Sequence, residues 1–154
     1  MSIDSRLAEL KLSLPAPRAP AFSYVPVAVH GDLAWVSGQL PWDADGSLPR
    51  GKLGAELAVE HGKAAARLCV LNGLSVLREA IGSLDRVARV VKVVGFVASA
   101  PGFVEQPAVV DGASTLIAEI FGENGRHARS AVGVAELPRG VPVEIEFVVA
   151  LTQA

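Results

Sequence analysis

Hydrophobic positions follow a helical period in two long stretches of the chain. Between about residues 56 and 81, apolar side chains form one stripe and charged side chains form the neighbouring stripe, which predicts a long amphipathic helix. Beyond Arg67 the polar stripe also becomes apolar, so we expect the second half of this helix to be the more deeply buried. Gly73 should bend the helix or admit a strand close to it, and Gly82 should end it.

Two other helices are predicted. One begins at Phe103 or Pro107 and ends at Phe121, where two glycines follow within four residues. The other is short, from about Asp4 to Leu12, and is separated from the rest of the chain by the proline-rich stretch 14–22. We therefore expect an N-terminal helix joined to the body by an extended segment.

Short runs rich in β-branched residues predict the strands. Residues 24–29 and 33–38 are separated by a His-Gly-Asp turn and should form a hairpin. The run 87–98 is nearly all apolar, which indicates a central strand buried on both faces. Residues 130–137 and 142–151 flank a Pro-Arg-Gly turn and should form a closing hairpin. The segment between the first hairpin and the long helix is predicted to be a loop with at most one short strand.

This order of elements predicts an α+β fold: one mixed β-sheet with two main helices on one face, plus an extra N-terminal helix. Strand–helix–strand connections occur twice, so some strand pairs should be parallel. The length indicates a single domain over 1–154, with 1–20 as the helix and proline-rich extension and 21–154 as the body. Two helices leave the other sheet face bare, and packing against copies of the chain would cover it.

The composition of the chain disfavours nucleic-acid-binding, membrane-spanning and secreted proteins. Hydrophobic residues make up 51% of the chain and charged residues 19%, with a net charge of −2. A basic patch for nucleic acid is missing, and no apolar run reaches the roughly 20 residues that span a membrane. The single cysteine, Cys69, forms no internal disulfide and fits a reducing compartment. The first residues lack the pattern of a signal peptide, so we expect a cytoplasmic protein without nucleic-acid or membrane partners.

Charged residues in the closing hairpin are the main candidates for chemistry. Arg129, Ala131 and Gly133 share one strand face, and the small residues leave room beside the guanidinium. Glu144 and Glu146 share a face of the next strand, but the sequence does not fix the register that would bring Arg129 and Glu144 together. Arg129 is either an anion-binding residue, with Glu144 holding a water or moving a proton, or half of a structural ion pair. From the residues alone, the ion pair is favoured.

Other chemistry has little support in the sequence. The three histidines stand apart, without a second ligand at metal-binding spacing, so neither a metal nor another cofactor is expected. A nucleophile elbow, a phosphate loop and a dinucleotide fingerprint are all missing. Cys69 lies among leucines and valines and should be a small buried residue. Trp35 and Trp42 are interpreted as packing residues rather than stacking platforms.

Three segments together resemble one known family. The stretches SYVPVAV, LAWVSGQLP and ARSAVGVAELPRGVPVEIE are similar to motifs of the Rid (reactive intermediate deaminase) family, also called YjgF-like or endoribonuclease L-PSP. The resemblance covers about residues 22–150. It implies a chorismate-mutase-like fold and a homotrimer in which three sheets form a central barrel, with clefts between subunits.

The resemblance also implies roles for individual residues. Arg129 matches the arginine that binds the carboxylate of an imino acid, and Glu144 matches the glutamate that positions or activates water. Tyr24 matches a tyrosine near the ligand, and Ser37 and Gly38 match residues that line the cleft. Three positions depart from the family pattern: Ala131 stands in place of the usual cysteine, Gly133 in place of a frequent glutamate, and Asp111 or Gly112 near a usual asparagine.

The function implied is hydrolysis of 2-aminoacrylate or 2-iminopropionate-type enamines and imines to 2-oxo acids and ammonia, without a cofactor. Ala131 would then line the substrate site beside Arg129. A different class, a non-catalytic trimer that binds small carboxylate metabolites, stays open because of the departures. Ribonuclease activity is disfavoured by the acidic charge balance and the lack of basic patches.

Overall fold

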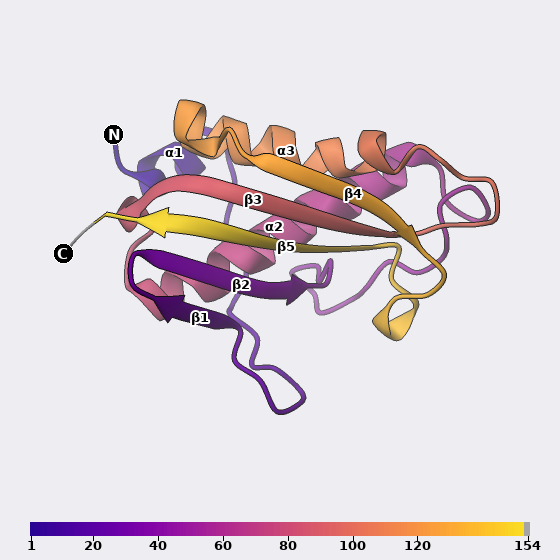
Figure 1. The fold of residues 1–154 in the computed structure, drawn as a ribbon, viewed down its shortest axis with the longest axis horizontal. Helices are drawn as coiled ribbons and strands as arrows, with labels where there is room; N and C mark the ends of the chain where they lie inside the picture. Colours follow the sequence, from indigo (N-terminus) through magenta and orange to yellow (C-terminus); the bar gives the residue numbers. More distant parts are fainter. Residues whose placement is uncertain (153–154) are drawn as a thin grey trace.

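A computed structural model describes residues 1–152 of the chain, so the last two residues of the predicted domain lie outside the described part. A five-stranded mixed sheet forms one layer, and the helices form a second layer behind it (Figure 1). The strands are β1 (Val27–His30), β2 (Leu33–Gln39), β3 (Val87–Ala98), β4 (Ala128–Val134) and β5 (Val143–Leu151). Their order across the sheet is β1-β2-β5-β3-β4. This confirms the predicted α+β architecture with one mixed sheet.

The helices agree closely with the hydrophobic pattern. They are α1 (Ile3–Glu9), α2 (Val59–Ile81) and α3 (Gln106–Phe121). Gly82 follows α2 with a φ of 84°, and Gly122 follows α3 with a φ of 59°, backbone conformations that glycine adopts without steric cost. Burial in α2 is concentrated in its second half, as predicted, with an unbroken buried run from Asn72 to Leu77.

The closing hairpin was predicted wrongly. β4 and β5 do not pair with each other, because β3 lies between them. β4 pairs with β3 in parallel, and β5 pairs antiparallel with both β3 and β2. The Pro-Arg-Gly segment forms a short 3-10 turn (Pro138–Gly140) that carries the chain across β3 rather than back along β4. The connection covers residues 135–142 and joins strands that are not neighbours in the sheet.

The two-sided burial expected for β3 is also corrected. Residues of β3 alternate between buried and partly or fully exposed positions along most of the strand. Val90, Val93 and Val97 are buried against the helix layer, whereas Val91 on the other face is 40% exposed. The apolar run 87–98 therefore forms a strand that is covered on one face only in the single chain.

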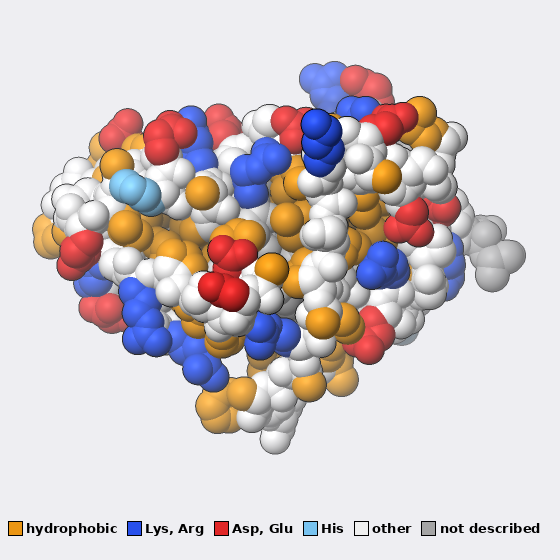
Figure 2. Space-filling model, turned by 180° about the vertical axis from the view of Figure 1, so that it is seen from behind, with side chains coloured by type: hydrophobic (Ala, Val, Ile, Leu, Met, Phe, Trp, Pro, Cys, Tyr) orange, Lys and Arg blue, Asp and Glu red, His pale blue; other side chains and the backbone are white. Residues whose placement is uncertain are grey.

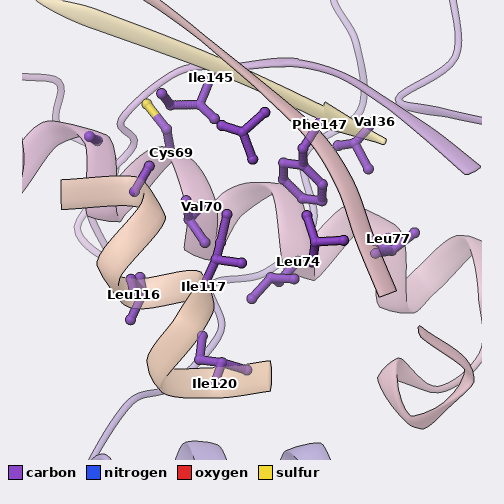
Figure 3. Packing of buried hydrophobic residues seen from close by; sticks show 14 of the residues in the cluster. Val36, Cys69, Val70, Leu74, Leu77, Leu116, Ile117, Ile120, Ile145 and Phe147 are labelled. Carbon is purple, nitrogen blue, oxygen red and sulfur yellow. The ribbon is translucent and has the colours of Figure 1, made fainter. Parts of the chain in front are cut away.

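The core lies between the sheet and the two long helices (Figure 3). Leu74 and Val70 of α2 pack with Ile117 of α3 and with Ile145 and Phe147 of β5. Gly73 permits this arrangement, because a Cβ built there would lie 2.5 Å from Cε1 of Phe147. The alternative that Gly73 admits a strand is therefore confirmed.

The uncovered face of the sheet carries apolar side chains at its surface. Trp35 of β2 is 41% exposed and Val132 of β4 is 44% exposed, and a hollow of about 200 Å³ opens beside Trp35, Lys92 and Glu146. The helix side has a different character, with acidic and basic side chains interspersed over it (Figure 2). No helix in residues 1–152 has both the length and the hydrophobicity needed to cross a membrane.

Candidate functional site

Arg129 lies on the edge strand β4 and faces α3. Its register partner on β3 is Val93, which is buried in the core, so both side chains are on the helix side of the sheet. Nη1 of Arg129 donates to Oδ1 of Asp111 at 2.6 Å and to Oγ of Ser114 at 3.2 Å. Nη2 donates to the carbonyl oxygen of Pro107 at 3.3 Å. The first turns of α3 thus hold the guanidinium in one orientation.

These contacts use only part of the guanidinium. An arginine has five N–H groups in a fixed planar fork, and three contacts within residues 1–152 engage Nη1 and one side of Nη2. The Nε–H and the second Nη2 N–H are left without a protein acceptor in this part of the chain. The side chain is 24% exposed and borders a hollow of about 280 Å³. An anion can therefore reach a guanidinium that is already oriented.

Asp111 changes the electrostatics of this position. Asp111 lies in the N-terminal half of α3. Its side chain is 60% exposed, and its carboxylate is in contact with Arg129. It compensates part of the positive charge that an incoming carboxylate would meet. The ion pair considered in the sequence analysis is therefore present, and it coexists with an unpaired N–H edge.

Glu144 lies on the opposite face of the sheet from Arg129. Its register partner on β3 is Phe96, three positions from Val93, and the neighbouring Val143 and Ile145 point into the core. The Glu144 carboxylate packs directly against Gly38 of β2, at a place where any larger residue would collide with it. Partial burial, together with the nearby charge of Glu146, raises the pKa of the Glu144 carboxyl above its ordinary value of 4.5.

Tyr24 and Ser37 belong to the β2 side of the sheet, away from the edge strand that carries Arg129. Ser37 donates from Oγ to the carbonyl oxygen of Val25 at 2.7 Å, which fastens the segment that carries Tyr24 to the end of β2. Tyr24 and Gly38 both line a hollow of about 430 Å³. The structure therefore places Ser37 and Gly38 at the end of β2 with Glu144 against Gly38, and Tyr24 lines a hollow beside Gly38. Arg129 lies apart from them, on the edge strand β4 and on the other face of the sheet.

Ala131 and Gly133, two of the departures from the family pattern, lie beside Arg129 on the helix-facing side of β4. Ala131 packs against the core. At Gly133 an added Cβ would lie 2.7 Å from Nε2 of Gln106, which donates to Ser99 Oγ and to the Phe103 carbonyl oxygen. The amide of Gln106 thus takes the space that a longer residue at position 133 would need.

Other expected assignments can be placed in the fold. Cys69 is fully buried, and this burial raises the pKa of its thiol well above the ordinary value, as suits an inert core residue. His127 forms a hydrogen bond through Nε2 with Ser114 Oγ at 2.9 Å, and its Nδ1 lies 2.6 Å from the Gly125 carbonyl oxygen. Residues 1–152 contain no group of three or more His, Cys, Asp or Glu side chains that could hold a metal ion.

Sequence reasoning missed one cluster near Tyr24. The Arg18 guanidinium carbon lies 4.2 Å from the centre of the Trp42 ring, and that of Arg139 lies 5.4 Å from it. Trp42 therefore carries two cation–π contacts, which the interpretation as a packing residue did not include. The signals were an arginine inside a proline-rich segment and another in the Pro-Arg-Gly turn, but nothing in the sequence placed them beside the same tryptophan.

Comparison with known proteins identifies the family. A family model described as "YjgF/chorismate mutase-like, putative endoribonuclease" matches residues 4–141. The chain belongs to this YjgF-like, or Rid, family. The resemblance drawn from its motifs is confirmed, and so is the chorismate-mutase-like fold.

Individual relatives place the chain within the YjgF-like family. Protein TCP17 of Trypanosoma cruzi is 50% identical over 150 residues, covering 97% of this chain and 94% of the relative. A solved structure of unknown function from Agrobacterium tumefaciens is 44% identical, with a TM-score of 0.90 over 98% of this chain and 94% of that one. A Shewanella oneidensis protein, described as a "putative endoribonuclease", is 34% identical with a TM-score of 0.94 over 98% and 100%.

The fold is shared more loosely with TdcF of Escherichia coli, which is 22% identical with a TM-score of 0.61 over 90% of this chain and 94% of that one. That protein was solved with bound serine. The higher TM-scores of the Agrobacterium and Shewanella proteins indicate that this chain shares more of its architecture with them than with TdcF.

Proposed function

We propose that this protein is an enamine/imine deaminase, which hydrolyses 2-aminoacrylate or 2-iminopropionate-type compounds to 2-oxo acids and ammonia. The observation that carries the proposal is the state of Arg129: a partly buried side chain whose guanidinium is held by α3, with one N–H edge left for an anion. A planar fork of this kind matches a carboxylate in a bidentate geometry.

The catalytic half of the site belongs to Glu144. The enamine first becomes the imine by taking a proton at its terminal carbon. Glu144, as the carboxylate, accepts a proton from water while the water oxygen bonds to the imine carbon. Glu144 then gives this proton to the amine nitrogen of the resulting carbinolamine, and ammonia leaves as the hydroxyl proton passes to water, which gives the 2-oxo acid. The raised pKa of Glu144 makes its carboxylate a stronger base than an exposed glutamate.

The two halves require more than one copy of the chain. Arg129 and Glu144 lie on opposite faces of one sheet, so a ligand gripped by one Arg129 meets the Glu144 of another copy. A homotrimer with its open sheet faces turned inward would supply this pairing and would cover the exposed Trp35 and Val132. Tyr24, Ser37 and Gly38 would then line the cleft together with Glu144, and Ala131 would lie beside the bound carboxylate. The bound serine in TdcF, an amino acid with the same carboxylate group, is consistent with a ligand of this class.

The ion pair with Asp111 favours a second candidate, a non-catalytic trimer that binds small carboxylate metabolites. Partial neutralisation of Arg129 would lower the affinity for the carboxylate of a transient imine. A stable carboxylate metabolite present at a higher concentration would still bind despite this lower affinity. In that case Arg129→Ala would abolish binding, and no turnover would be found with the unmodified protein.

A coupled assay tests the deaminase proposal. A dehydratase that produces 2-aminoacrylate from serine is run with and without the protein, and ammonia release is followed against spontaneous hydrolysis. We expect a clear acceleration that Arg129→Ala and Glu144→Gln each reduce at least a hundredfold. The control is Arg67→Ala, which removes an arginine paired with Glu119 on the helix layer. No acceleration by the unmodified protein, or full activity in Arg129→Ala, would contradict the proposal.

A further inference from the structure

Two arginines from distant parts of the chain meet over one indole ring. Arg18 belongs to the proline-rich segment after α1, and Arg139 belongs to the turn before β5; their guanidinium carbons lie 4.2 and 5.4 Å from the centre of the Trp42 ring. Stacking on an aromatic face orients a guanidinium while leaving its N–H edges free to donate. The arrangement presents two positive forks at one place.

The core of the protein holds this cluster in position. Asn72 and Ser75 are the buried polar side chains of the described core, 4% and 2% exposed. Asn72 donates from Nδ2 to the carbonyl oxygen of Trp42 at 2.9 Å, and Ser75 donates from Oγ to the carbonyl oxygen of Pro15 at 2.5 Å. A buried polar group is stable only when it is hydrogen-bonded. Both groups in α2 thus fasten the loops that carry Trp42 and Arg18.

Arg139 reaches the ring through an unusual backbone conformation. Its φ is 60° and its ψ is 12°, in the left-handed region that residues with a side chain rarely enter. Glycine, which enters this region without steric cost, stands next in the chain as Gly140. The conformation turns the Arg139 side chain toward Trp42 and Arg18.

The charge of the cluster is not compensated within the chain. In residues 1–152 neither Arg18 nor Arg139 forms an ion pair, although seven other pairs are present. Both arginines line the hollow of about 430 Å³ that Tyr24 and Gly38 also line, and Gly38 is in contact with Glu144. Two free guanidinium groups therefore border the place where the proposed catalytic carboxylate lies.

We propose that Arg18 and Arg139, stacked on Trp42, bind a second carboxylate of the ligand, so that the preferred substrates are 2-imino acids with an acidic side chain. The assignment of the reacting end rests on the proposed function: Arg129 of one copy holds the carboxylate next to the imine, and Glu144 of another copy acts on the bound water. The second carboxylate lies in the Arg18–Arg139 hollow on the Glu144 side. Small apolar imino acids leave this hollow filled only with water.

Stable dicarboxylates test the subsite without any turnover. Trp42 is in contact with both arginines, so succinate and glutarate should change its fluorescence as they bind, and Trp42→Phe identifies this part of the signal. We expect dicarboxylates to bind at least tenfold more tightly than butyrate, and Arg18→Ala or Arg139→Ala to remove that preference. Arg78→Ala, an exposed arginine on α2 that pairs with Asp4, is the matched control.

Each result separates the subsite from the deaminase proposal. Loss of the dicarboxylate preference in Arg18→Ala and Arg139→Ala supports the subsite, even if the coupled assay shows no deamination. Equal binding of butyrate and glutarate, or dicarboxylate binding unchanged in both arginine variants, would overturn it. Tighter binding of inorganic phosphate than of any dicarboxylate would also overturn the assignment to a carboxylate. Circular dichroism of each variant shows whether it is folded, and Arg139→Lys, which keeps the charge, should retain part of the preference.

Discussion

Arg129 and Glu144 point to opposite faces of one β-sheet, although they are separated by only fifteen positions in the chain. β4 and β5 both pair with β3, one on each side, and the register places Arg129 beside Val93 and Glu144 beside Phe96. Because side chains alternate along a strand, Val93 and Phe96 face opposite sides. A reaction that uses both residues must therefore join two copies of the chain.

Mixed oligomers should reveal such a shared site. Arg129→Ala and Glu144→Gln should each be inactive alone, and assembling them together should restore activity. With random mixing in a cyclic trimer, about a quarter of the sites would receive an intact Arg129 and an intact Glu144. The measurement is ammonia release after the two variants are unfolded and refolded together. The control mixes Arg129→Ala with Arg129→Gln, which cannot regain activity. No recovery in the first mixture, with trimers present, would show that each site is built within one chain.

Asp111→Asn should strengthen carboxylate binding. The substitution removes a negative charge 2.6 Å from the Arg129 guanidinium, and the amide oxygen can still accept a hydrogen bond from it. Partly exposed ion pairs contribute up to about 1 kcal/mol, so we expect roughly a two- to fivefold lower dissociation constant for small carboxylates. Isothermal titration calorimetry provides the measurement, and Glu119→Gln is the control on the same helix. Weaker binding in Asp111→Asn would mean that orientation of the fork by Asp111 matters more than its charge.

Glu144→Gln should stabilise the protein at neutral pH. The pKa of Glu144 is raised in the folded state, so the folded protein holds this proton more tightly than the unfolded chain does. The contribution of Glu144 to the free energy of unfolding is therefore fully present below its ordinary pKa of 4.5. This contribution is lost as the pH rises through the raised pKa of the folded state. Thermal melts at pH 7 should show a higher Tm for Glu144→Gln, and the gain should shrink near pH 4. The exposed Glu79→Gln is the control. A lower Tm at pH 7 would contradict this direction.

Gly73→Ala should destabilise the fold, against the usual preference of helices for alanine. The new Cβ would meet the Phe147 ring at 2.5 Å, and overpacking of this kind costs about 1–3 kcal/mol in a buried core. Urea unfolding measures the loss, and Gly73→Ala combined with Phe147→Leu should recover part of it because the smaller side chain clears the space. A Gly73→Ala protein as stable as the original would show that the strand can move away from the helix.

The helices and strands with a regular hydrophobic pattern were predictable from sequence, whereas the contacts between distant segments of the chain were not. The stripe in α2 and the small-residue face of Arg129, Ala131 and Gly133 follow from local spacing, and the structure places them as expected. The prediction of a closing hairpin was wrong because nothing in the sequence of the turn at Arg139 indicates that β3 lies between β4 and β5. The cluster around Trp42 was not predicted for a related reason. Arg18 and Arg139 are far apart in the sequence and reach the same ring only because the chain packs at long range.

The middle strand of the sheet, β5, follows the other four strands in the chain. In the folded sheet β1 pairs with β2 and β4 pairs with β3, and these two strand pairs are joined to each other only through β5. The final strand joins both at once, on β2 along one side and on β3 along the other. The sheet can therefore close only after β5 has been made, and until then the two strand pairs leave exposed edges that neighbouring nascent chains could capture.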